Sequence, residues 1–251
     1  MLNKYKKNIY SENGEDGVLL YILKKAKLIE NTRPLWCCEF GAWDGIHGSN
    51  TFNLVKNYNF NAVYIEGDKK KFSDLLETQK KFPKITALNK LVSFQTKSDN
   101  SLDKILKKTN IIKNFDILSI DIDSFDLAVW KSLKKYRPKI VVIEINSSLA
   151  PGIKQLHSSK KQGNSFTSTL EFAKKNGYEL VCHTGNCIFL EKKILKKIKF
   201  QQKYINKPQM LFDFTWVEKK EENFLKKILK SCLPNFLIFY LRKINKYLLQ
   251  I

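Results

Sequence analysis

The sequence of 251 residues lacks the segments that carry a chain into or across a membrane. Its first residues, MLNKYKKNIYSENGEDG, contain no apolar run typical of a secretory signal. No stretch reaches the roughly 20 uncharged apolar residues that span a bilayer. The five cysteines follow no spacing of a disulfide framework, which favours a reducing compartment. We therefore expect a cytoplasmic protein.

Acidic residues are scarce, because 24 Asp and Glu stand against 45 Lys and Arg, for a formal net charge of +21. This excess predicts an anionic partner, which can be nucleic acid, anionic lipid or an acidic glycan. Charge alone does not choose among the three. The hydrophobic fraction of 43% is enough for one α/β domain with an appendage.

A zinc site is not favoured by the few cysteine and histidine residues. Cys182, His183 and Cys187 carry zinc-binding groups, and His47 is a possible fourth ligand from far along the chain. The segment 178–192 around them is, however, more typical of two strands joined by a turn.

Strand-like and helix-like segments alternate along most of the chain, and this alternation predicts a largely parallel sheet covered by helices. Five strand–helix units lead to an antiparallel hairpin about Gly185. We predict one α/β domain over residues 1–217 and a basic helical tail over 218–251. The predicted strands before the hairpin are 35–40, 61–68, 85–93, 115–123 and 139–146, and the predicted helices are 11–26 (capped by Ser11 or Asn13), 50–57, 70–82, 101–109, 125–136, and one from Ser165 or Ser168 to Gly177.

A glycine-containing turn, FGAWDGIHG (residues 40–48), follows the first predicted strand. It is not the G-x-G-x-x-G pattern that binds pyrophosphate, and it carries Asp44 where a phosphate would be repelled. Other predicted strands also end in acidic residues. Because the carboxyl ends of parallel strands border one crevice, we expect these acids to converge there. They are Glu39 and Asp44, Glu66 and Asp68, Asp121 and Asp123, and Glu144.

Glu66 ends the second predicted strand, where a carboxylate can accept hydrogen bonds from both hydroxyls of a ribose. This position indicates a nucleoside, whereas the acidic turn disfavours a phosphate. S-adenosylmethionine meets both conditions, since it carries a ribose, a sulfonium and an α-ammonium group but no phosphate. We therefore predict this cofactor. The alternatives are that Asp44 only caps its turn, or that an NAD-dependent enzyme accepts pyrophosphate despite it.

Several ordered segments resemble the motifs of FkbM-type class I S-adenosylmethionine-dependent methyltransferases. They lie between about residues 10 and 195 and read SENGEDG, CCEFGAWDGIHGSNT, AVYIEGD, SLDKIL, FDILSIDIDSFDLAVWKSL and RPKIVVIEIN. The resemblance implies a Rossmann-like fold with a seven-stranded, mostly parallel sheet and an antiparallel last strand. It also implies that acids and glycines of the first turn hold the methionine part and Glu66 the ribose. The predicted cofactor-binding residues are Glu39, Gly41, Ala42, Asp44, Gly45, Glu66, Gly67 and Asp121.

A sugar hydroxyl, a common acceptor in this family, is a poor nucleophile, so a general base worth roughly 10²–10⁴-fold in rate is expected. Asp121 and Asp123 stand two residues apart in a predicted strand, so we predict that both point the same way and share a proton or Mg²⁺. Asn146 or Glu144 would complete the metal shell. Alternatively, Asp121 contacts the cofactor and Asp123 caps the following helix.

Two further segments are candidates for the site. His157, in the loop after the fifth predicted strand, is a candidate base at neutral pH. SENGEDG, residues 11–17, is predicted either to cover the cofactor, with Glu15 or Asp16 close to it, or to be a plain capped helix. The predicted catalytic residues are Asp121, Asp123 and His157, and the predicted metal ligands are Asp121, Asp123 and Asn146.

The tail changes in composition after Glu218. Two helical stripes of apolar residues flank Pro234, and Lys and Arg accompany them with no acid after Glu222. This pattern is typical of helices that lie in an anionic membrane interface, here the inner face of the cytoplasmic membrane. The alternative is that the stripes pack on the domain or on a second subunit.

These features favour an O-methyltransferase that acts on a sugar hydroxyl of a surface polysaccharide or a lipid-linked glycan precursor. Its expected partners are that glycan and the membrane surface. Nucleic acid is not expected, because there is no added RNA-binding module and IDID (120–123) lacks the Asn/Asp-Pro-Pro-aromatic signature of base N-methylation. The alternatives are an RNA methyltransferase, suggested by the charge, and a non-catalytic membrane-associated scaffold.

Overall fold

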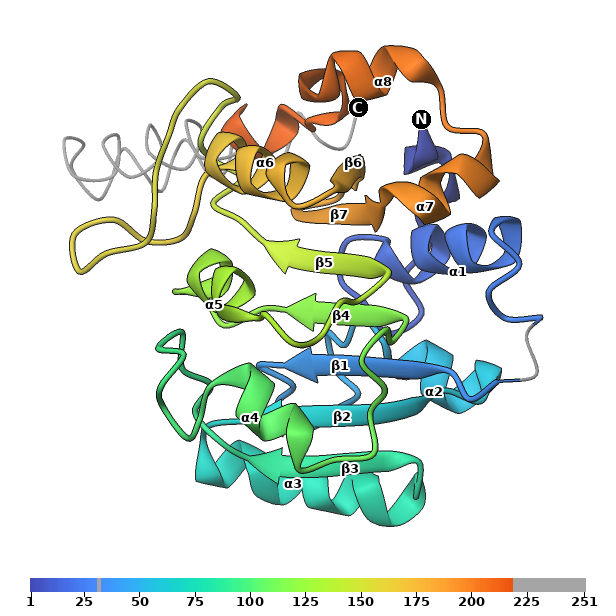
Figure 1. Cartoon of the computed structure of the whole chain (residues 1–251), viewed down its shortest axis with the longest axis vertical. Helices are drawn as coiled ribbons and strands as arrows, with labels where there is room; N and C mark the ends of the chain where they lie inside the picture. The colour runs from blue at the N-terminus through green and yellow to red at the C-terminus, as the bar shows by residue number, and fades with distance from the viewer. Residues whose placement is uncertain (31–32, 219–251) are drawn as a thin grey trace, which may run out of the picture. The chain divides into compact units, whose positions relative to one another are not determined.

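A computed structural model describes residues 1–30 and 33–218, of which Met1–Asp213 form one compact unit. The centre of this unit is a sheet of seven strands in the order β3-β2-β1-β4-β5-β7-β6 (Figure 1). The predicted tail lies outside the described residues apart from Glu218. The strands are β1 (Trp36–Phe40), β2 (Asn61–Glu66), β3 (Ile85–Asn89), β4 (Ile117–Ile120), β5 (Ile140–Glu144), β6 (Tyr178–His183) and β7 (Asn186–Glu191).

The strand directions confirm the predicted sheet. β1 pairs in parallel with β2 and β4, β2 with β3, and β4 with β5. β7 runs antiparallel to both β5 and β6, so the last strand of the chain is the reversed one. Gly185, with a φ of 119°, lies in the turn of the predicted hairpin, in a conformation that glycine adopts most easily.

Helices connect most of the strands and cover the sheet, so the central strands are buried on both faces. All four residues of β4 are buried, including Ser119, so both faces of this strand are covered and its side chains do not alternate between buried and exposed. Within the described ranges, no helix is long and apolar enough to cross a bilayer. The helices are α1 (Glu15–Lys25), α2 (Phe52–Tyr58), α3 (Lys69–Lys81), α4 (Leu102–Lys107), α5 (Asp126–Ser132), α6 (Phe166–Lys175), α7 (Lys192–Leu195) and α8 (Gln202–Asn206), with short 3-10 helices η1 (Leu2–Tyr5), η2 (Lys196–Ile198) and η3 (Pro208–Leu211).

Helix boundaries follow the capping residues, not all of which were predicted. Ser165 caps α6, and its hydroxyl accepts a hydrogen bond from the Ser168 N–H, as one of the two predicted caps requires. The cap residue of α1 is Gly14 rather than Ser11 or Asn13. α5 ends four residues earlier than predicted, because the Asp103 carboxylate accepts the backbone N–H groups of residues 134 and 135 and turns the chain away.

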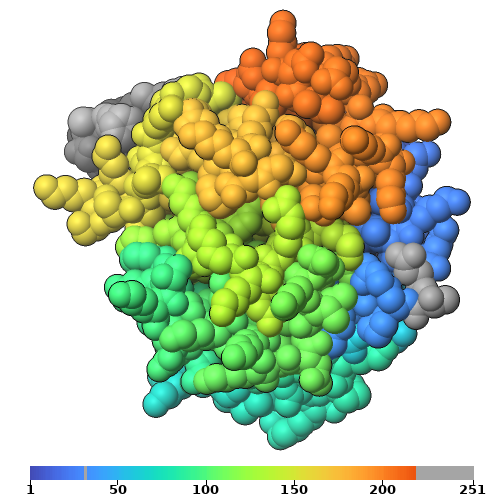
Figure 2. Space-filling view, in the orientation of Figure 1, coloured from blue at the N-terminus to red at the C-terminus, as the bar shows by residue number. Residues whose placement is uncertain are grey.

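The carboxyl ends of the parallel strands lead into the loops that form the site. The arrowheads of β1, β4 and β5 point to the same side in Figure 1. The long loop between β5 and α6 projects beyond that side, and Figure 2 shows it in yellow as a separate lobe of the surface. Ligands of open α/β sheets bind at this edge.

Candidate functional site

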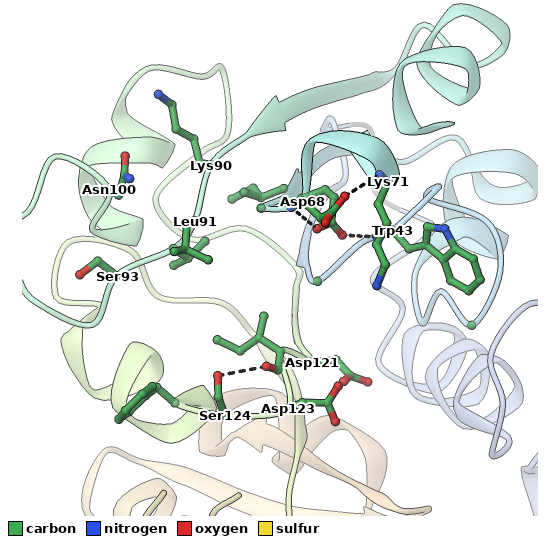
Figure 3. A pocket seen from close by; sticks show the side chains of 18 of the residues that line it. Trp43, Asp68, Lys71, Lys90, Leu91, Ser93, Asn100, Asp121, Asp123 and Ser124 are labelled. Atoms are coloured by element: carbon green, nitrogen blue, oxygen red, sulfur yellow. Dashed lines mark hydrogen bonds between the residues drawn. The ribbon is translucent and has the colours of Figure 1, made fainter. Parts of the chain in front are cut away.

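A cavity of about 780 Å³ opens where β1, β2 and β4 end. Ligand pockets in proteins are typically about 300–1,000 Å³, so the cavity has the size of a nucleoside-sized site with room for a second molecule. Its walls come from the loops after β1, β2, β3 and β4 and from the loop before α1. Figure 3 shows these walls around a common space, with Trp43, Asp68 and Lys71 in one, Lys90, Leu91, Ser93 and Asn100 in another, and Asp121, Asp123 and Ser124 in a third.

The turn after β1 lies directly against the end of β4. Gly41 lines the cavity with a φ of +77°, and a Cβ there would stand 1.7 Å from the carbonyl oxygen of Asp121. Only glycine allows this approach. The N–H groups of Gly41 and Ala42 both donate to the Ile65 carbonyl, at 3.1 and 3.2 Å. Ala42, predicted to bind the cofactor, is 4% exposed and packs in the hydrophobic core.

Glu66 ends β2, is only 7% exposed and lines the cavity together with Gly67. Its Oε2 accepts the N–H of Trp43 at 2.8 Å, and its Oε1 accepts the N–H of Asp68 at 2.7 Å. A carboxylate has about four acceptor sites, so each oxygen can take a further hydrogen bond. The backbone therefore holds Glu66 in one orientation and leaves it able to accept two neighbouring hydroxyls.

Asp44 and Gly45, both predicted to hold the methionine part, are not among the residues that line the cavity. Asp44 Oδ1 accepts the N–H groups of Ile46 and His47, both at 2.9 Å, so it caps its own turn. Burial raises the pKa of Asp44, but hydrogen bonds from the His47 ring and from these N–H groups outweigh it and lower the pKa overall. Gly45 packs against Leu75 of α3.

Glu39 is also absent from the cavity wall and is 4% exposed. Its carboxylate accepts the hydroxyls of Ser49 and Thr51 at 2.7 and 2.5 Å and the N–H of Asn50 at 2.9 Å. Burial raises its pKa, although the hydrogen bonds from these residues act in the opposite direction. Glu39 thus fixes the loop that enters α2.

Asp121 and Asp123 both line the cavity, but not for the predicted reason. β4 ends at Ile120, and Asp123 has a left-handed φ of 57°, so the alternation of a strand does not set their directions. Asp126, the first residue of α5, accepts the N–H groups of residues 122 and 124 and shapes the loop between them. Asp123 therefore does not cap α5.

The carboxylates that follow β4 and the one that ends β5 interact strongly. Burial raises the pKa of Asp121 to about 7, and the charges of Asp126 and Asp123 add to this effect. Burial, followed by the charges of Asp121 and Asp123, raises the pKa of Glu144 to about 9. Such groups titrate together, so protons are shared among them near neutral pH. A positively charged ligand beside them would favour their ionised forms.

The balance of charge in the cavity is opposite to that of the chain. Five carboxylates and two lysines line it, whereas the whole chain carries +21. The local excess of negative charge is therefore a property of the site itself. These carboxylates, together with the two free acceptor positions of Glu66, fit S-adenosylmethionine, which is a cation with a ribose and no phosphate.

Asn146 and His157 do not line this cavity. The Asn146 amide donates to the Gln162 carbonyl at 3.0 Å, and its oxygen accepts the Ser148 hydroxyl at 2.6 Å. His157 Nδ1 accepts the Gly163 N–H at 3.1 Å. Among residues 1–30 and 33–218, no group of three or more His, Cys, Asp or Glu side chains is arranged to hold a metal ion.

The sequence prediction missed two contributions to the cavity. Glu12 lines it, whereas Glu15 and Asp16, the acids predicted to lie near the cofactor, are buried and only 1% and 2% exposed. Phe94 and Phe125 also line it with large exposed fractions. Phe94 and Phe125 each follow the end of a strand, β3 and β4, by a few residues. This position in the sequence could have indicated that both rings lie at the site.

Comparison with known proteins gives one family and several distant structures. The model of the methyltransferase FkbM domain matches residues 39–180, more than half of the chain. The S-adenosylhomocysteine complex of TrmK from M. capricolum is 17% identical with a TM-score of 0.44, over 90% of this chain and 92% of that one. The N-terminal domain of EvdMO1 with S-adenosylhomocysteine is 9% identical with a TM-score of 0.42, over 72% and 80%. No curated protein matches the sequence.

The matched segment begins at Glu39, just before the first turn, and ends inside β6. It therefore includes the four strand ends whose loops build most of the cavity. The sheet, with its seventh strand reversed, has the class I Rossmann-like architecture. The chain belongs to the FkbM family of S-adenosylmethionine-dependent methyltransferases.

Proposed function

We propose that the protein transfers the methyl group of S-adenosylmethionine to a hydroxyl of a sugar, in a surface polysaccharide or a lipid-linked glycan precursor. One observation carries the choice of acceptor. Phe94 and Phe125, 40% and 36% exposed, line the cavity with ring centroids 4.7 Å apart. The rings of His157 and Phe125 form a T-shaped pair, with centroids 4.4 Å apart.

Exposed aromatic rings beside polar groups suit a sugar. One face of a hexose presents C–H groups, whose slight positive charge is attracted to the negative face of an aromatic ring. Ser93, Asn100 and Ser124 also line the cavity and supply hydroxyl and amide groups for sugar hydroxyls. RNA bases stack on aromatic rings as well. The negative cavity favours the sugar, because it would repel a phosphate backbone.

In the proposed mechanism Asp121 accepts the proton of the acceptor hydroxyl. When bound, S-adenosylmethionine supplies an electrophilic methyl group. A carboxyl with a pKa of about 7 is partly ionised at neutral pH and can take up the proton that the hydroxyl loses. The cavity also holds the methyl donor and the acceptor hydroxyl side by side, and this proximity contributes the rest of the rate enhancement.

The proposal is tested by incubating the full chain with S-adenosylmethionine that carries a ¹³C-methyl group and with surface glycan extracted from the source organism. We expect a new O-methyl resonance in the glycan that survives mild alkali, as an ether does and an ester does not. Total RNA from the same cells is offered in a parallel reaction. Label in RNA with none in the glycan would replace the proposed acceptor.

Phe125→Ala is expected to raise the KM for the glycan about tenfold, because one stacking surface is lost, with aromatic contacts worth about 0.5–1.5 kcal/mol beyond their buried area. Steady-state kinetics at saturating cofactor measure this change. Phe125→Tyr keeps the ring and is the matched control. An unchanged KM in the alanine variant would remove Phe125 from the acceptor site.

The lipid-linked form of the acceptor rests on sequence alone. Residues 219–251, which carry the predicted basic amphipathic helices, lie outside the described part of the chain. Their composition favours an anionic bilayer surface. A carrier lipid in that bilayer would present its glycan to a peripheral enzyme.

A further inference from the structure

One carboxylate of the cofactor cavity comes from the segment before the first long helix, which has been given no role so far. Glu12 belongs to the loop before α1 and lines the same cavity as Glu66 and Asp121. Its backbone carbonyl accepts the Asn8 amide at 2.7 Å. Within residues 1–30 and 33–218, its carboxylate takes part in no hydrogen bond and no ion pair.

The loop that carries Glu12 is held in place by a buried carboxylate. Asp16 Oδ2 accepts the N–H groups of Ile9, Tyr10 and Ser11 at 2.9, 2.7 and 2.7 Å. The Ser11 hydroxyl accepts the Asp16 N–H at 3.1 Å in return. Hydrogen bonds to a charged group are among the strong ones in proteins. The position of Glu12 is therefore built into the fold.

Glu12 stands over the turn that follows β1. A Cβ added to Gly48, which has a φ of +68°, would lie 3.4 Å from Glu12 Oε1. Gly48 thus leaves room for this carboxylate beside the turn. The charge of Glu12 also contributes to the raised pKa of Asp121, so the two carboxylates act on the same part of the cavity.

The amino-acid end of the cofactor has no other acidic partner at this turn. Glu66 suits the ribose, and Asp121 is assigned to the reacting end. Asp44 and Glu39, which the sequence suggested for the methionine part, bind N–H and hydroxyl groups of their own loop. We propose that Glu12 binds the α-ammonium group of S-adenosylmethionine, and that the loop 8–14 covers this end of the site.

The test measures binding by calorimetry, with the full chain and no acceptor, so it does not depend on the proposed glycan. S-adenosylhomocysteine carries the amino-acid group, whereas 5′-methylthioadenosine keeps the adenosine and the thioether without it. We expect Glu12→Gln to weaken the first about tenfold, since one charge-assisted hydrogen bond is reduced to a neutral one, and to leave the second unchanged. Glu77→Gln, which removes an equal charge from the exposed face of α3, is the matched control and should change neither.

Three results would overturn the proposal. Equal losses for both ligands would mean that Glu12 acts on the adenosine or on the loop as a whole. Tighter binding of S-adenosylhomocysteine would place the α-carboxylate, not the ammonium group, beside residue 12. Unchanged affinity for both ligands would leave Glu12 outside the site.

Discussion

Glu66→Ala is expected to weaken S-adenosylmethionine binding about 100-fold. The side chain would offer two charge-assisted hydrogen bonds to the ribose, and hydrogen bonds to charged groups contribute about 1.5–3 kcal/mol each. Its loss also frees the N–H groups of Trp43 and Asp68, which now position the carboxylate. Calorimetric titration of the purified chain with the cofactor measures the change.

Two comparisons make this result specific to the ribose. Glu66→Gln keeps one acceptor oxygen, so we expect an affinity between those of the alanine variant and the parent. Glu77→Ala, on the exposed face of α3, removes the same charge far from the cavity wall and should bind normally. A Glu66→Ala variant that binds as well as the parent would show that the ribose lies elsewhere.

Asp121→Asn is expected to lower kcat by about 10²–10⁴-fold, the usual contribution of a general base. The pH dependence follows from its raised pKa. Below pH 7 the carboxyl is mostly protonated and cannot accept a proton, and above it the carboxylate can. Because kcat/KM reports the ionisation of the free enzyme, the kcat/KM of the parent should rise as the pH increases from 6 to 8, and the asparagine variant should lose this rise.

Asp121→Asn should lower activity without lowering the stability of the fold. The folded pKa of Asp121 is raised from 3.8 to about 7, so its ionisation favours the unfolded chain. This cost grows as the pH rises from about 4 to about 7 and is constant at higher pH. Asp121→Asn should then unfold at the same or a higher temperature than the parent at pH 8. An inactive variant that also unfolds earlier would point to misfolding, and a fully active one would dismiss Asp121 as the base.

The sheet could be predicted from the sequence because long apolar runs have few alternatives in a covered parallel sheet. β4 and β5 are buried on both faces, and their hydrophobic segments were assigned to strands without any motif. The position of Glu66 was predictable for the same reason, since a residue at a strand end is placed by the strand. What failed was the assumption that β4 continues to Asp123.

The side chains of the loops could not be assigned in this way. A carboxylate at a strand end or in a turn can bind a ligand or the polar groups of a nearby loop. In this structure Asp44 binds N–H groups of its own turn, and Glu39, at the end of β1, binds groups of residues 49–51. The order of residues does not reveal which partner is nearer. The segment before α1 shows the same limit, because Asp16 binds its own loop and the neighbouring Glu12 reaches the cavity.

The close approach of Gly41 to the Asp121 carbonyl means that the proposed cofactor site and the proposed base are joined by one direct backbone contact. Both residues directly follow a paired position of adjacent strands, Phe40 opposite Ile120. The register of β1 and β4 sets the distance between these two residues, and this register does not depend on a ligand. The alignment that we propose between methyl donor and proton acceptor is thus set by the pairing of these two strands, and one added residue at either strand end would disturb both sites together.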